Sequence, residues 1–251
     1  MKYNYNDVIK YWQNQNIDSK EKLESTLDNF RILFAYNSGA IENSEINYHD
    51  TREIFENGKV ISFTGNLRTI FEISNQKVCY EYLLDKIIAK EAFSEDLIKK
   101  VHKLLTMGTY DERRYILNEE RPREYKKHDY VTGREEVGAS AKDVSKNIKE
   151  LVDEINKACV KDFDGVIKVA TYFHCKFENI HAFADGNGRV GRTLLNYILM
   201  INNLPPLIVY DEDKKYYYAA LEKFDKEDDI KSMYEFLKYE MEKTWQKTLD
   251  K

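Results

Sequence analysis

Residues 181–192 place a histidine, an aspartate, three glycines and two arginines at a spacing that could bind and transfer a phosphate group. The turn Asp185-Gly186-Asn187-Gly188 leads into a predicted helix that begins at Asn187. Glycines let the backbone take left-handed conformations and approach a ligand closely. The free N–H groups and the dipole of a helix start favour an anion. We therefore expect a phosphate group to bind the amides of Gly186, Asn187 and Gly188.

Four side chains near this turn supply charge and a proton acceptor. Arg189 and Arg192 are three residues apart, so they share a helix face and can both reach phosphate oxygens. Asp185 beside an anion site indicates a cation between the two, and Mg²⁺ held by one carboxylate and the phosphates fits this role. His181, with an ordinary pKa near ~6.5, is suited to accept a proton at cellular pH.

The run His181-Ala-Phe-Ala-Asp-Gly-Asn-Gly-Arg-Val-Gly-Arg192 resembles the signature of the Fic family. That signature is HxF, then Asp or Glu, then GNGRxxR, and every specified position is filled. The resemblance extends from about Asp96 to Leu237 and includes Leu194-Leu195-Asn196, Pro205-Pro206 and Tyr217-Tyr218. It implies an all-α fold, a helical bundle with a short β-hairpin flap.

The resemblance also implies an activity, the transfer of AMP from ATP to a Ser, Thr or Tyr hydroxyl of a target protein or of the chain itself. His181 would remove the hydroxyl proton while Asp185 holds Mg²⁺. By likeness, Arg189 serves the β-phosphate and Arg192 the γ-phosphate. By the same likeness, Tyr217 and Tyr218 lie near the adenine. Asp225 stands where many relatives have Asn.

A flap in such proteins docks the target segment by main-chain pairing. The matching region is about residues 127–140, which carries a short β-like piece at 128–132 and departs from the commoner proline-rich version. We expect the protein substrate to dock there.

Ser38-Gly-Ala-Ile-Glu42-Asn43 matches a second family pattern, Ser or Thr, three residues, Glu, then Gly or Asn. In relatives this segment lies on a short helix beside the active site. A carboxylate paired with Arg192 would occupy the partner of the γ-phosphate and repel the phosphate itself. The pattern therefore predicts an autoinhibitory contact between Glu42 and Arg192.

Other functions remain open at this point. A Fic-like core could move another nucleotide or a phosphate group, although the intact Gly188 favours AMP, and some relatives remove AMP at the same site. A non-catalytic binding module would be free to lose His181 or Asp185. A metal-dependent hydrolase lacks an obvious third ligand, because His174 is better explained by helix packing.

The elements around the motifs are expected to be helices. The apolar spacing predicts helices over Ser94–Met107 and Asp143–Val160, and over the ranges 187–202, 214–224 and 230–245. Another helix is predicted to begin at Asp164, which would be its N-cap, and to lead up to His181. An earlier helix is expected to turn Phe71, Val78, Tyr82 and Ile87 inward. We divide the chain into an N-terminal helical region with the inhibitory motif, residues 1–93, and a catalytic domain with C-terminal helices, residues 94–251.

Composition narrows the function classes. The 251 residues are 42% hydrophobic and 33% charged with a formal net charge of −5, which argues against binding a nucleic-acid backbone. Three widely spaced cysteines predict neither a disulfide framework nor a zinc knuckle. The first residues lack a secretory h-region, and no run approaches the ~20 apolar residues of a membrane span. These features are typical of a cytoplasmic protein.

Overall fold

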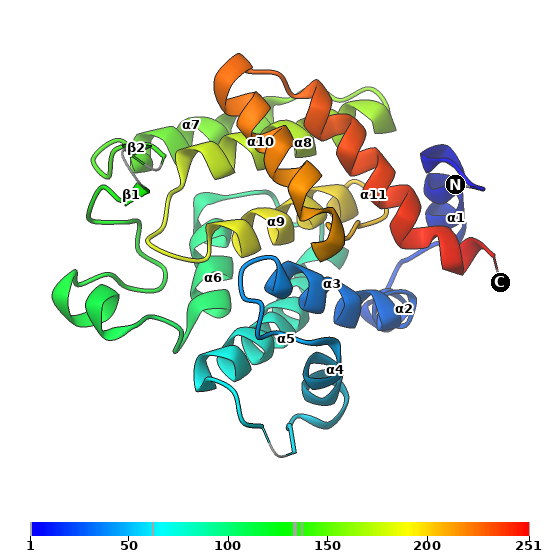
Figure 1. Cartoon of the computed structure of the whole chain (residues 1–251). Coiled ribbons are helices and arrows are strands. Elements are labelled where there is room, and N and C mark those ends of the chain that lie inside the picture. Colours follow the sequence, from blue (N-terminus) through cyan, green and yellow to red (C-terminus); the bar gives the residue numbers. More distant parts are fainter. Residues whose placement is uncertain (1, 62, 133–134, 137, 251) are drawn as a thin grey trace.

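The computed structural model describes residues 2–61, 63–132, 135–136 and 138–250. Helices dominate it, which confirms the all-α prediction (Figure 1). The helices are α1 Tyr5–Asn14, α2 Lys20–Thr26, α3 Asp28–Ala40, α4 Tyr48–Asn57, α5 Leu67–Ile88, α6 Glu95–Thr106, α7 Val144–Lys157, α8 Phe163–Ile180, α9 Asn187–Ile201, α10 Lys214–Glu227 and α11 Lys231–Leu249, with a π-helical turn at Arg113–Leu117 and a 3₁₀ turn at Asp211–Asp213.

Helix α9 lies in the middle of the bundle, with α8 and α10 on one side and α3, α5 and α6 on the other (Figure 1). Its side chains are buried almost without interruption from Asn187 to Leu199. A helix that is apolar and buried on nearly all sides is held by its neighbours. The loop that leads into α9 is therefore anchored at the centre of the fold.

The only strands among the described residues are β1, Val131–Thr132, and β2, Glu135–Glu136. They pair antiparallel, with Val131 opposite Glu136 and Thr132 opposite Glu135. Residues 133, 134 and 137 of the predicted flap lie outside the described residues. A docking flap over residues 127–140 stays a prediction.

Helix α5 differs from the expectation. Phe71 and Val78 are exposed, so the prediction that they turn inward was wrong, whereas Ile87 is buried. Polar side chains take part of the buried face instead, and they bind neighbouring backbone: Gln76 donates to Ala35 O at 2.8 Å and Asn75 to Met107 O at 2.8 Å. Buried polar groups need such partners, so these hydrogen bonds help to set the rotation of the helix.

Helix α8 begins earlier than expected. Its N-cap is Asp162, whose carboxylate accepts the Gly165 N–H at 2.8 Å, and not Asp164. Asp164 already lies in the first turn, where it pairs with Lys168 at 2.7 Å. Helix α7 ends at Lys157 because Ala158 takes an extended conformation, with ψ 116°.

The main hydrophobic core joins both ends of the chain. Trp12 of α1 packs edge-on against Trp245 of α11, with ring centroids 5.5 Å apart, and the two termini lie on the same side of the molecule (Figure 1). The division at residues 93 and 94 stays a prediction. Among the described residues, no helix is both long and apolar enough to cross a membrane. The three cysteines are free: Cys79, Cys159 and Cys175.

Candidate active site

The loop between α8 and α9 is built to hold its shape. His181 ends α8 in a left-handed conformation, φ 50°, and Gly186 precedes α9 with φ 82°. The Asn187 side chain closes the loop, because its Nδ2 donates to Phe183 O at 2.7 Å and its Oδ1 accepts the Phe183 N–H at 2.9 Å. The Phe183 ring stacks on His102, with centroids 3.7 Å apart. The amides at the start of α9 are thus preorganised.

A cavity of about 260 Å³ opens over this turn. Most of the predicted site residues line it together, as do two residues that the sequence did not single out, Arg114 and Glu178. The predicted residues on its wall are Glu42, His181, Asp185, Gly186, Asn187, Gly188, Arg192, Tyr217 and Tyr218. Ser38, Asn43 and Arg189 are not on this wall.

His181 is partly buried at the edge of the cavity. Burial lowers the pKa of its imidazole to about 4, and the nearby Lys126 acts in the same direction. The ring is therefore neutral at physiological pH and can accept a proton.

Arg192 is buried and is bound by the last turn of α3 and by the residues that follow it. Its Nη2 donates to Glu42 Oε1 at 2.8 Å and to Ser38 O at 2.9 Å, and its Nε donates to Ser38 Oγ at 3.1 Å. The structure thus forms the predicted contact between Glu42 and Arg192. The amides of Glu42 and Asn43 both donate to Gly39 O, and this tight turn positions the two side chains.

The Glu42 carboxylate also lies against the anion-binding turn. A Cβ atom on Gly188 would stand only 2.3 Å from Glu42 Oε1 and 2.9 Å from Arg192 Nη1. A side chain at this position would force the Glu42 carboxylate or the Arg192 guanidinium to shift. A side-chain anion thus occupies the position where the amide turn and Arg192 would meet a phosphate.

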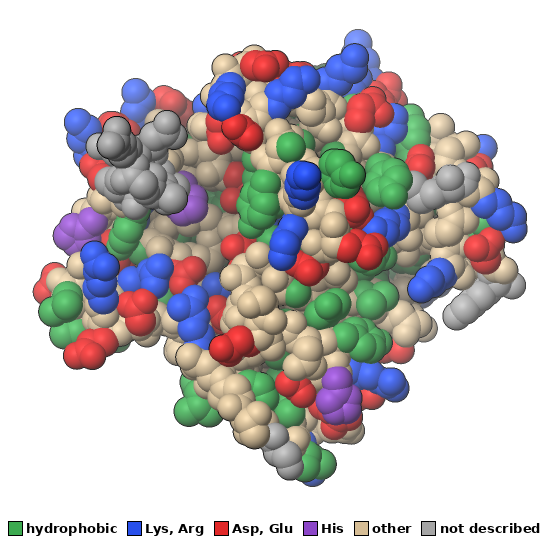
Figure 2. Space-filling view, in the orientation of Figure 1, with side chains coloured by type: hydrophobic (Ala, Val, Ile, Leu, Met, Phe, Trp, Pro, Cys, Tyr) green, Lys and Arg blue, Asp and Glu red, His purple; other side chains and the backbone are tan. Residues whose placement is uncertain are grey.

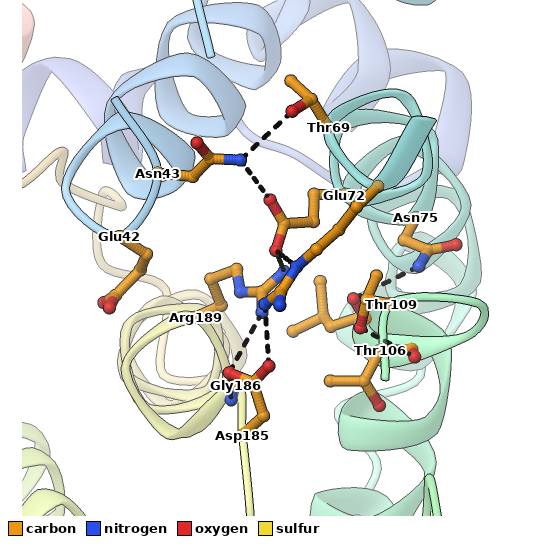
Figure 3. A network of polar contacts seen from close by, with 12 residues as sticks. Glu42, Asn43, Thr69, Glu72, Asn75, Thr106, Thr109, Asp185, Gly186 and Arg189 are labelled. Carbon is orange, nitrogen blue, oxygen red and sulfur yellow. Dashed lines mark hydrogen bonds and ion pairs between the residues drawn. The ribbon is translucent and has the colours of Figure 1, made fainter. Parts of the chain in front are cut away.

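Arg189 points away from Arg192, toward α5. Its Nη1 lies 3.2 Å from Glu72 Oε1, and its Nη2 lies 3.7 Å from Asp185 Oδ1. Asn43 donates to Glu72 Oε2 at 2.8 Å, so Glu72 lies between Asn43 and Arg189 (Figure 3). Sequence reasoning missed Glu72, although its spacing of four from Arg68 is a recognisable helical ion pair.

Asp185 is also bound by a residue that the sequence analysis missed. Arg68, in the first turn of α5, places its Nη2 at 2.8 Å from Asp185 Oδ2, and its Nε donates to Glu72 Oε1 at 3.1 Å. The other Asp185 oxygen, Oδ1, accepts the Gly186 N–H at 2.7 Å. Among the described residues, no three His, Cys, Asp or Glu side chains gather as a metal site.

The far wall of the cavity is aromatic and acidic. Tyr217 is buried and its hydroxyl lies 2.9 Å from His174 Nε2, whereas Tyr218 is half exposed. Asp225 accepts a hydrogen bond from Asn179 at 2.8 Å. Glu178, one turn before His181, has a buried Oε1 without a hydrogen-bond partner among the described residues, and burial raises its pKa to about 8.

Comparison with known proteins decides the family of this site. Residues 92–199 match the model of the Fic/DOC family. This part of the chain is a Fic domain.

Relatives of the Fic domain agree. The chain is 31% identical over 196 residues to the protein adenylyltransferase fic-1 of Caenorhabditis elegans, an alignment that covers 76% of this chain and 36% of that protein. It is 40% identical over 78 residues to the protein adenylyltransferase Fic of Drosophila persimilis, covering 31% of this chain and 15% of that one. The chain therefore spans about a third or less of the length of these curated relatives.

Solved Fic structures share the whole fold. A Fic domain containing signaling protein from Bacteroides thetaiotaomicron superposes with a TM-score of 0.82 at 23% identity, covering 97% of this chain and 94% of that one. A fragment of Fic-1 from C. elegans superposes with a TM-score of 0.75 at 24% identity, covering 98% and 69%. The agreement includes the N-terminal helices, which lie outside the matched family region.

Proposed function

We propose that the chain is a protein adenylyltransferase that transfers AMP from ATP to a Ser, Thr or Tyr hydroxyl of a target protein, and to itself. One observation carries this proposal. A neutral histidine, a preorganised amide turn and a buried arginine face one cavity, and an anion, the Glu42 carboxylate, already lies against the turn. The names of the related proteins agree with this activity.

In the proposed reaction the amides of Gly186, Asn187 and Gly188 bind the α- and β-phosphates. His181 takes the proton of the attacking hydroxyl, the new O–P bond forms at the α-phosphorus, and the bond to pyrophosphate breaks. Fixed amides stabilise the charge that develops on the phosphoryl oxygens without having to reorient. Tyr217 and Tyr218 would lie beside the adenine.

Arg189 and Arg192 are the proposed partners of the β- and γ-phosphates. Arg189 fits this role because its buried Nε lacks a hydrogen-bond partner in the described part of the chain. Asp185 is the proposed ligand of Mg²⁺, and a single carboxylate beside a phosphate site suits an ion that takes its other ligands from phosphates and water. When bound, Mg²⁺ would neutralise phosphate charge.

The contact between Glu42 and Arg192 is proposed to inhibit the enzyme. The carboxylate occupies the guanidinium that the γ-phosphate needs, so ATP would bind weakly or with its α-phosphorus misaligned. Ser38 strengthens the contact through its hydroxyl and carbonyl oxygens. Activation would require the Glu42 side chain to leave Arg192.

The target segment is proposed to dock on residues 127–140. The end of this stretch lies beside His181, the proposed general base. Ala139 N–H donates to Ile180 O at 3.0 Å, and a Cβ on Gly138 would stand 2.4 Å from His181 Cβ. A strand paired there would bring its hydroxyl near His181. We also propose a cytoplasmic location, which suits three free cysteines.

The test is incubation of the Glu42→Gly variant with α-labelled ATP, Mg²⁺ and cell lysate, followed by intact-mass analysis. We expect AMP adducts to rise about tenfold or more over those of the wild-type protein, since ~1.4 kcal/mol of lost inhibition is a factor of ten. A second change, His181→Ala, should abolish them. Equal labelling with and without Glu42 would refute the inhibitory role, and an adduct of another mass would identify a different transferred group.

The same preparation tests the alternative of AMP removal. A purified AMP-modified target that is incubated with the wild-type protein should keep its AMP if the chain only adds AMP. Loss of the adduct that depends on His181 would show that the same site catalyses the reverse modification.

A further inference from the structure

Beside the cavity, on the α5 side of Asp185, two arginines and two carboxylates form a compact cluster. Arg68 contacts Asp185 and Glu72 at 2.8 and 3.1 Å, and Arg189 contacts the same two carboxylates at 3.7 and 3.2 Å. The two positive and two negative charges balance. Each carboxylate is therefore shared by both guanidinium groups.

The members of the cluster differ in burial. The side chains of Glu72 and Arg189 are 3% and 2% exposed, whereas those of Asp185 and Arg68 are 18% and 35% exposed. A buried charge cannot leave its partner without a large desolvation cost, but a partly exposed one can return to water. Arg68 is therefore the member that can move.

Both carboxylate oxygens of Asp185 are occupied. Oδ1 accepts the Gly186 N–H at 2.7 Å, and Oδ2 accepts Arg68 Nη2 at 2.8 Å. A divalent cation on Oδ2 would stand next to the Arg68 guanidinium, and like charges at such a separation repel. The two cannot share that oxygen.

We propose that Arg68 is a positioning residue for the metal ligand. It competes with the divalent cation for the Oδ2 position of Asp185 and withdraws toward Glu72 when the cation binds. This inference rests on the proposed function. The cation must displace a positive charge that the chain itself supplies, so Arg68 sets the concentration of metal that the enzyme requires.

Glu72 connects this exchange with the inhibitory segment. Its Oε1 binds Arg68 and its Oε2 accepts from Asn43, the residue after Glu42. The turn that carries Glu42 to Arg192 thus also holds the carboxylate to which Arg68 retreats. Metal binding at Asp185 and release of Glu42 both act on this one turn.

The test measures metal affinity directly. Mn²⁺ is titrated into the Glu42→Gly protein and into Glu42→Gly with Arg68→Gln, each with a non-hydrolysable ATP analogue, and free Mn²⁺ is followed by its electron paramagnetic resonance signal. We expect Arg68→Gln to lower the Mn²⁺ concentration at half-saturation about two- to fivefold, the range of a partly exposed ion pair. Arg52→Gln is the control, because Arg52 pairs with Glu56 at 2.8 Å on an exposed face of α4.

Unchanged or weaker Mn²⁺ binding in Arg68→Gln would overturn the proposal. If that variant failed to fold by circular dichroism, Arg68→Met would decide by the same criterion, because it also removes the charge while it keeps an unbranched side chain that can pack in the same place. AMP adducts of the Glu42→Gly protein are measured in parallel. Tighter Mn²⁺ binding without any adduct would leave this inference standing and reject the proposed transferase activity.

Discussion

Arg189 and Arg192 lie one turn apart on α9, and each faces a glutamate from the N-terminal helices, but the two pairs are built differently. Glu42 follows α3 on a tight turn and its side chain is 36% exposed, while Glu72 lies within α5 and its side chain is 3% exposed. Asn43 stands between the pairs and binds Glu72. One glutamate can swing into water, and the other has no such route.

In the proposed mechanism this difference makes the Glu42 pair a regulatory contact and the Glu72 pair a structural one. Release of Glu42 uncovers Arg192 at the cavity, and the carboxylate regains water as it leaves. Release of Glu72 would leave the buried Arg189 guanidinium without its nearer carboxylate, and this would lower the stability of the fold. If the proposed inhibition holds, the same residue types on one helix regulate the enzyme on one side and stabilise the fold on the other.

The free energy of unfolding of two variants tests this difference most directly. Glu72→Gln should lower the free energy of unfolding by about 3 kcal/mol, since it leaves Arg189 buried without its main anion. Glu42→Gln should cost less, about 1 kcal/mol, because the Glu42 carboxylate is partly solvated and the buried Arg192 keeps its hydrogen bonds to Ser38. Urea unfolding followed by circular dichroism measures both. Equal losses would mean that the two sides of α9 are not different in kind.

The pH profile tests the Glu42 side more closely. The pKa of His181 is lowered to about 4 by burial, so its neutral form persists as the pH falls well below the ordinary value of a histidine. We expect kcat/KM of the Glu42→Gly protein to change less than about twofold between pH 8 and 5.5. A histidine with an ordinary pKa of ~6.5 would lose about tenfold by pH 5.5. A half-maximum near pH 6.5 would contradict the neutral, buried base.

The smallest effect should come from the residue between the pairs. Asn43→Ala removes its hydrogen bonds to Glu72 and Thr69, at 2.8 and 3.2 Å, and should cost about 1 kcal/mol of unfolding free energy. It should raise AMP incorporation about twofold, because the turn that holds Glu42 loosens, which is a modest change next to that of Glu42→Gly. Asn57→Ala, on the exposed end of α4, is the control and should leave incorporation unchanged.

Charged side chains of both signs cover one face of the molecule. Figure 2 shows Lys and Arg interspersed with Asp and Glu over the viewed face, without a large basic patch. A nucleic-acid backbone requires such a patch.

The sequence alone determined the chemistry of the loop from His181 to Arg192. Its geometry depends on neighbours along the chain: the left-handed Gly186, the amides at the start of α9, and the Asn187 side chain bound to Phe183. The segment from Ser38 to Asn43 was also recognisable, because a short pattern resembled its relatives. Local rules of backbone conformation and hydrogen bonding suffice for such features.

Only the tertiary structure decided which charges meet. Arg68 and Asp185 are 117 residues apart, and nothing in either neighbourhood indicates the other. Phe71 and Val78 were misplaced for a related reason, since contacts of α5 with several other helices set its rotation more strongly than its own apolar spacing. Ion pairs between distant residues depend on where whole helices pack. The packing of a helix is set by contacts throughout the core, which no single segment of the sequence specifies.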